Sequence, residues 1–146
     1  MPLQTLFSLS GAAAMGGWLA LAFAPSRWPL ARSLALAVAA TLALLYTALI
    51  AVFWTQGEGG FSSLGNLDAL FEQRGHLLAG WVHYLAFDLL VGVWEREEAA
   101  RVAMRRRILL PCLCLTFLFG PIGWLAFLAA RHFTLATRPA AMPQAA

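Results

Sequence analysis

The chain is poor in charge and contains no lysine. Only 12% of its 146 residues are charged and 61% are hydrophobic, whereas an ordinary soluble domain is about 25% charged and about 45–50% apolar. It also lacks a phosphate-binding glycine loop, a paired-cysteine metal motif and a nucleophile elbow. These absences argue against an ATP-driven or hydrolytic role, and no soluble surface remains to bind nucleic acid. We expect neither a cofactor nor a metal.

Long apolar stretches are what the sequence does contain. A helix needs about 20 apolar residues to cross about 30 Å of hydrocarbon, and four stretches qualify. We therefore predict an all-α membrane protein in which a bundle of four transmembrane helices forms a single domain over residues 1–146, with a disordered tail from about 134. The predicted spans are residues 5–24, 33–54, 77–94 and 108–130.

The first span resembles a signal peptide only superficially. No positive charge precedes it, and Pro25 follows its small-residue motif at the position where cleavage would occur. We therefore expect a retained helix. A bacterial inner membrane is the simplest location, because no transit-peptide composition precedes this span.

The arginines predict an orientation. Seven of the ten lie in the connections 25–32 and 95–107, and positive charge favours the cytoplasmic side. We therefore place both connections in the cytoplasm and both termini outside, with the arginines facing anionic headgroups of membrane lipid.

The connection between spans two and three has its own pattern. Apolar residues recur at helical spacing over about 63–74, and Asn66 and Gly75 are suitable first and last caps. We expect a short amphipathic helix on the outer membrane surface. It is either a plain connector or a lid over a site.

The third span carries polar residues in its middle, which is costly in a membrane and typical of functional positions. They are His83, Tyr84 and Asp88, and the last is flanked by Phe87. His83 and Asp88 lie about 140° apart on a helix, so we expect both to face one interior without pairing directly. The alternative is that both serve only helix assembly.

The fourth span contains Pro121 between Gly120 and Gly123, which predicts a kink and a close helix approach. Thr116 could bond the backbone there. We expect Cys112 and Cys114 to be core residues, because neighbours two apart on a helix diverge too far for a joint metal site or a disulfide.

Aromatic side chains within the spans could line a groove for an elongated polyene, although such residues are more often plain packing. Together with the glycine–proline turn, they form the predicted ligand-binding set: Trp81, Phe87, Phe117, Phe119, Gly120, Pro121 and Trp124. We expect spans three and four to be neighbours, with His83 and Asp88 turned toward residues 116–123.

Two segments resemble a known family. The run Trp81-Val-His-Tyr-Leu-Ala-Phe-Asp88 within 61–95, and the later segment from Pro111 to Gly123, are similar to the abscisic-acid-deficient-type membrane proteins. Together they cover about the C-terminal 60% of the chain. The resemblance implies a role related to forming neoxanthin from violaxanthin, which is an epoxide-opening isomerisation.

The side-chain chemistry suits such a step. A carboxyl group kept neutral by apolar surroundings could protonate the departing oxygen and an imidazole could accept a carbon-bound proton. Under this hypothesis Asp88 is the acid, His83 the base, and Tyr84 orients the oxygen of a carotenoid or other isoprenoid. Two alternatives remain: a noncatalytic membrane scaffold, and a small transporter or proton path through Asp88 that would need a homo-oligomer.

Overall fold

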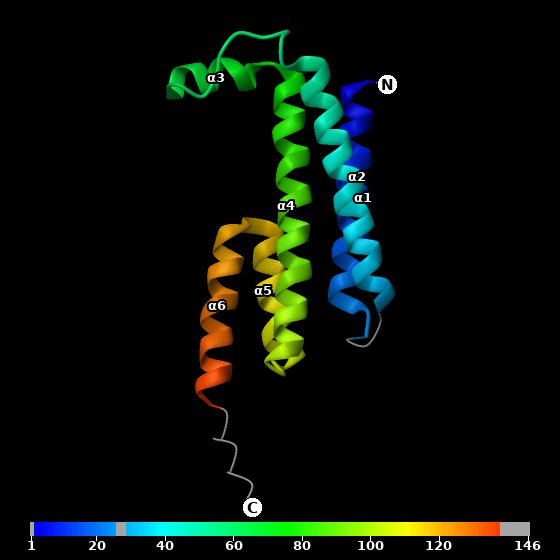
Figure 1. Ribbon diagram of the computed structural model, residues 1–146, viewed down its shortest axis with the longest axis vertical. Coiled ribbons are helices and arrows are strands. Elements are labelled where there is room, and N and C mark those ends of the chain that lie inside the picture. Colours follow the sequence, from blue (N-terminus) through cyan, green and yellow to red (C-terminus); the bar gives the residue numbers. More distant parts are fainter. Residues whose placement is uncertain (1, 26–28, 138–146) are drawn as a thin grey trace, which may run out of the picture. The chain divides into compact units, whose positions relative to one another are not determined.

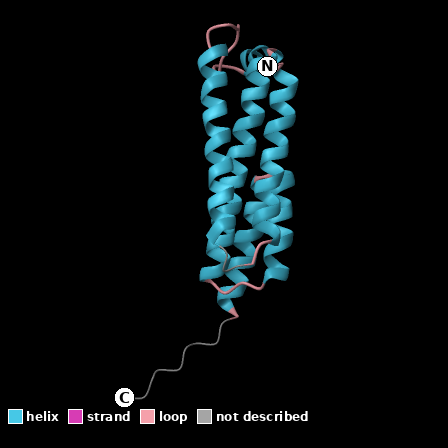
Figure 2. Ribbon diagram, turned by 90° about the vertical axis from the view of Figure 1, so that its right-hand side faces the viewer, coloured by secondary structure: helices cyan, strands magenta, loops and turns pink. Residues whose placement is uncertain are grey.

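The computed structural model describes residues 2–25 and 29–137 of the chain (Figure 1). These residues form helices joined by loops, without a strand (Figure 2), which confirms the all-α prediction. The helices are α1 (Leu3–Phe23), α2 (Pro29–Phe53), α3 (Leu64–Glu72), α4 (Arg74–Arg101), α5 (Arg106–Phe119) and α6 (Pro121–Ala136).

The chain divides into two compact units, Met1–Val93 and Trp94–Ala146, and α4 contributes to both. Three helices, α1, α2 and α4, are long and apolar enough to cross a membrane. All three therefore agree with the predicted spans, although α4 extends beyond the predicted 77–94 at both ends.

In the first unit, α1 runs parallel to α4 and α2 runs antiparallel to it. The rings of Phe7 and Trp81 lie 5.4 Å apart near the start of α1 and α4, and Trp18 packs against Gly92 farther along both helices. On the side of α4 that faces α2, the ring of Phe53 at the end of α2 covers Gly75 at the start of α4. Glycine at positions 75 and 92 therefore lets large aromatic rings contact the α4 backbone directly.

The core of the first unit lies where these three helices meet. Its buried residues include Leu42 and Leu49 of α2 and Val82 and Ala86 of α4. One face of α4 is thereby covered, and Tyr84 packs against this core. His83 and Asp88 lie on other faces of the helix.

The short helix α3 lies across the ends of the long helices of the first unit (Figures 1 and 2), as the amphipathic pattern predicts. Its cap differs from the prediction, because the side chain of Ser63 and not that of Asn66 caps the helix. The Ser63 hydroxyl accepts a 3.2 Å hydrogen bond from the backbone amide of Asn66. Phe71 anchors α3 on α4 by contacting Gly80. Gly75 does not end α3, because it already belongs to α4.

The second unit contains a helical hairpin, so the prediction of one kinked helix over 108–130 is wrong. The chain reverses at Gly120, which has φ 50° and ψ −102°, a conformation that glycine adopts without a side-chain clash. Pro121 then begins α6, where its missing amide proton has no cost. A Cβ at Gly123 would clash with the backbone nitrogen of Thr116, so the backbones of α5 and α6 touch directly.

The hairpin arms are too short to cross a membrane. Their 14 and 16 residues span about 21 and about 24 Å at 1.5 Å per residue, against about 30 Å of hydrocarbon. The described chain thus has three candidate spans and not four. Helix α6 also continues to Ala136, into the predicted disordered tail, and residues 138–146 of that tail lie outside the described residues.

Candidate functional site

The candidate site is a stripe along one face of α4. Five residues follow one another at intervals of three or four, which places them on the same side of a helix. They are Arg74, Leu77, Trp81, Tyr84 and Asp88. From Arg74 to Asp88 the stripe is about 21 Å long at 1.5 Å per residue. All five residues belong to the first unit.

A tyrosine and a carboxyl group form the polar end of this stripe. The side chains of Tyr84 and Asp88 are hydrogen-bonded to each other, and both are half-buried. The Oδ2 atom of Asp88 is buried and has no hydrogen-bond partner within the part of the chain that the structure describes. One oxygen of the carboxyl is thus bonded to the phenol, and the buried Oδ2 atom has room for one further hydrogen bond.

Aromatic rings continue the stripe from this pair toward the start of α4. The Trp81 ring lies 5.7 Å from the Tyr84 ring and 5.4 Å from the Phe7 ring of α1. Three rings from two helices therefore form an aromatic wall next to the carboxyl group. Sequence reasoning identified Trp81 but missed Phe7, because nothing in the sequence says that α1 runs parallel to α4.

His83 does not face the same interior as Asp88, contrary to the prediction. Its side chain is exposed, and its ring lies 5.3 Å from Tyr46 of α2 and 4.5 Å from Phe87. The imidazole thus lies between aromatic rings on the α2 side of α4, whereas Tyr84 and Asp88 lie with Trp81 on the α1 side. The predicted separation of the two faces is present, but no shared interior joins them.

The second unit contains buried polar contacts that the sequence did not identify. The Thr116 hydroxyl donates a 2.8 Å hydrogen bond to Oε1 of Glu95, and both residues are fully buried. Thr116 therefore connects α5 to the end of α4. Its hydroxyl bonds this carboxylate and not the backbone near Pro121, which the sequence had suggested as its partner. Cys112 is buried nearby, but Cys114 is exposed and is not a core residue.

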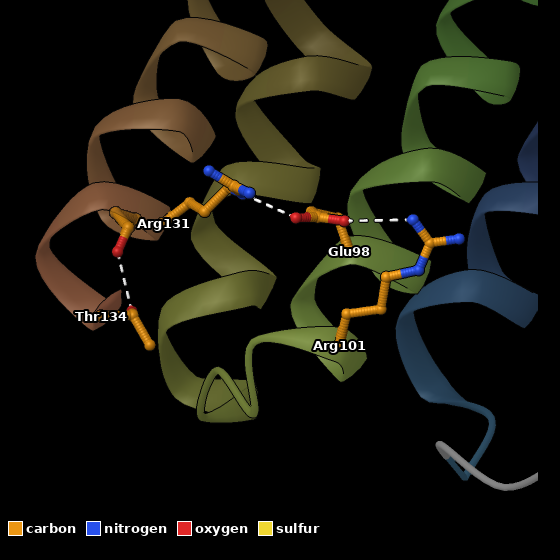
Figure 3. A network of polar contacts seen from close by, with 5 residues as sticks. Glu98, Arg101, Arg131 and Thr134 are labelled. Carbon is orange, nitrogen blue, oxygen red and sulfur yellow. Dashed lines mark hydrogen bonds and ion pairs between the residues drawn. The ribbon is translucent and has the colours of Figure 1, made fainter. Parts of the chain in front are cut away.

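A second polar contact joins the end of α4 to α6. Glu98 accepts a 2.7 Å hydrogen bond from Nε of Arg131 and a 3.4 Å bond from Arg101 (Figure 3). Because Arg131 lies beside Glu98, the last turns of α6 lie level with the last turns of α4. The hairpin therefore returns to the end of α4 from which α5 departs.

The remaining predicted ligand-binding residues gather around the hairpin turn in the second unit. Phe119 and Trp124 are 56% and 40% exposed, and Phe117 is half-buried beside Gly120 and Pro121. These exposed rings are available to a ligand or to lipid. The composite site that would join them to His83 and Asp88 stays a prediction. Among the described residues, no group of three His, Cys, Asp or Glu side chains could hold a metal ion.

Comparison with known proteins gives one match. A family model described as ABA DEFICIENT 4-like matches residues 5–127, which is most of the chain. No curated protein and no solved structure matches significantly.

Proposed function

The chain belongs to the ABA DEFICIENT 4-like family, and from this membership we propose that it isomerises a carotenoid or related isoprenoid within the bilayer. The family is one of membrane proteins related to neoxanthin synthesis. The observation that carries the proposal is the hydrogen-bonded Tyr84–Asp88 pair beside the Trp81 ring. A buried acid adjoining an aromatic wall suits a long, flat, apolar substrate with one reactive oxygen.

The proposed reaction opens an epoxide without a cofactor. The Asp88 carboxylic acid donates its proton to the epoxide oxygen as the carbon–oxygen bond breaks, while a base removes a proton from a neighbouring carbon. The electron pair of that carbon–hydrogen bond becomes the second double bond of an allene, and the product is an allenic alcohol. Atoms balance, since one proton is added to oxygen and one is lost from carbon. Tyr84 orients the reacting carboxyl group through its hydrogen bond.

The Asp88 carboxylate formed by proton donation is the proposed base, because the epoxide oxygen and the carbon that loses its proton lie only two bonds apart. The His83 ring lies on the α2 side of α4, beside Tyr46 and Phe87, away from the Tyr84–Asp88 pair. His83 is the alternative acceptor. An H83Q variant distinguishes the two: it loses activity if His83 is the base and keeps it if the carboxylate alone suffices.

The test is turnover of an epoxy-carotenoid by the full-length protein in liposomes, followed by chromatographic separation of the isomers. Removing a general acid lowers a rate by about 10²–10⁴-fold, so D88N should lose that much activity while remaining folded. The matched control is D68N, because Asp68 lies on α3 outside the stripe. Full activity in D88N would reject the acid role, whereas absence of turnover by the parent protein itself would favour a noncatalytic scaffold. Transport without turnover would favour the proton-path alternative.

The proposed location is a bacterial inner membrane, with residues 25–32 and 95–107 in the cytoplasm. The hairpin changes the expected position of the C-terminus. Since Arg131 lies beside Glu98, the end of α6 returns to the side of the arginine-rich segment 95–107. The N-terminus is then outside and the C-terminus cytoplasmic, which places Arg131 on the side that positive charge favours.

A further inference from the structure

An open groove lies between the first turns of α1 and α4 in the first unit. Its volume is about 700 Å³, within the range of about 300–1,000 Å³ that is usual for ligand sites. The lining residues come from these two helices and from the residue that precedes α1: Pro2, Leu3, Gln4, Phe7, Arg74, Leu77, Leu78 and Trp81.

The groove has a positively charged mouth. Arg74 is exposed and, among the described residues, makes no hydrogen bond or ion pair. The start of α1 faces the same groove and has no side-chain cap, so its first amide groups and the helix dipole also favour negative charge. Arg74 is the one arginine between the second and third predicted spans, on the side where positive charge is disfavoured. Because Arg74 has no acidic partner among the described residues, an anion from outside the chain can pair with it.

The wall of the groove is apolar. The Phe7 and Trp81 rings lie 5.4 Å apart, and Leu77 is 56% exposed. A charged mouth above an aromatic and aliphatic wall matches a molecule with an anionic head and a hydrocarbon chain. A neutral polyene would leave Arg74 without a partner, and a free anion would leave the wall uncovered.

We propose that this groove binds an anionic phospholipid of the outer leaflet, with its phosphate at Arg74 and one acyl chain against Phe7 and Trp81. The bound chain lies on the same face of α4 as Tyr84 and Asp88, so it would compete with a carotenoid for the Trp81 ring. The site exists whether or not the protein is an enzyme, because it needs only the charge at the mouth and the apolar wall.

The experiment measures lipid binding to the purified full chain in a neutral maltoside detergent. Phosphatidylglycerol and phosphatidylcholine with identical acyl chains are titrated, and bound lipid is counted by native mass spectrometry alongside the melting temperature. We expect tighter binding of phosphatidylglycerol and a larger rise in melting temperature. R74Q should weaken its binding roughly tenfold, as expected for losing one charge-assisted contact. R74K should retain most of the binding, because a lysine still pairs with phosphate as a point charge.

The matched control is R105Q, which removes an exposed arginine at the start of α5 and should leave the Arg74-dependent binding unchanged. Because Arg74 makes no contact that holds the fold, R74Q should melt like the parent protein without added lipid. Equal affinity for the two lipids, or an R74Q variant that keeps the parent's preference, would overturn the proposal. So would equal stabilisation by glycerol phosphate, since that molecule has the headgroup without the chain.

Discussion

The two units of this protein differ in the contacts that hold their helices together. In the first unit, long apolar helices meet through side chains that pack into glycine positions, such as Trp18 on Gly92. In the second, an apolar core that includes Cys112 and Phe127 is supplemented by polar bonds from α5 and α6 to the end of α4, Thr116 to Glu95 and Arg131 to Glu98. These polar bonds hold the two short helices in place, whereas each unbroken span satisfies its own backbone.

The comparison also separates the two kinds of polar residue on α4. Asp88 belongs to the first unit and is hydrogen-bonded to Tyr84 of the same helix. Glu95 and Glu98 belong to the second unit and bond to residues of α5 and α6. Acidic residues on one helix therefore divide into one that bonds within α4 and two that bond to the hairpin.

The largest effect on stability should come from the hairpin. In G123A the new methyl group would clash with the backbone nitrogen of Thr116, and backbone cannot move aside as a side chain can. We expect destabilisation at or above the upper end of the usual 1–3 kcal/mol for overpacking, with α6 becoming sensitive to protease in detergent. The control is G16A in α1, where nothing lies within 4 Å. A G123A variant that melts like G16A would show that the hairpin is not closely packed.

A smaller effect should follow from removing the Thr116 hydroxyl. T116V keeps the shape of the side chain but removes its bond to Glu95, and bonds between membrane helices contribute about 0.6–1.7 kcal/mol. We expect a loss of about 1 kcal/mol in denaturation by detergent. In contrast, T41V should change little, because Thr41 is exposed and bonds only to the backbone of its own helix at Ala37. Equal stability of T116V and the parent protein would weaken the distinction between the two units.

Much of the first unit could be predicted from the sequence. Uninterrupted apolar length determines α1, α2 and α4, and the spacing of Trp81, Tyr84 and Asp88 places them on neighbouring positions of one helix. The face that α2 covers could not be predicted, because periodicity within α4 does not say which neighbour lies on each side. For that reason His83 was expected in an interior and is instead exposed beside Tyr46 and Phe87.

The second unit was harder to predict for a specific reason. Residues 108–130 have the length and apolarity of a span, and proline within such a stretch indicates a kink as readily as a break. The reversal depends on the positive φ of Gly120 and on direct contact between Gly123 and Thr116. Both are tertiary features that hydropathy does not record. The partner of Glu95 was equally hidden, because Thr116 lies 21 residues away.

The most direct test of this account is the side of the membrane on which α6 ends. After Cys112 and Cys114 are replaced by serine, single cysteines are introduced at Ser62, Arg105 and Thr137, and intact cells are treated with an impermeant thiol reagent. We expect labelling at position 62 only, with positions 105 and 137 labelled after the cells are opened. Labelling of position 137 from outside intact cells, with position 105 still protected, would contradict it by showing that residues 106–136 cross the membrane.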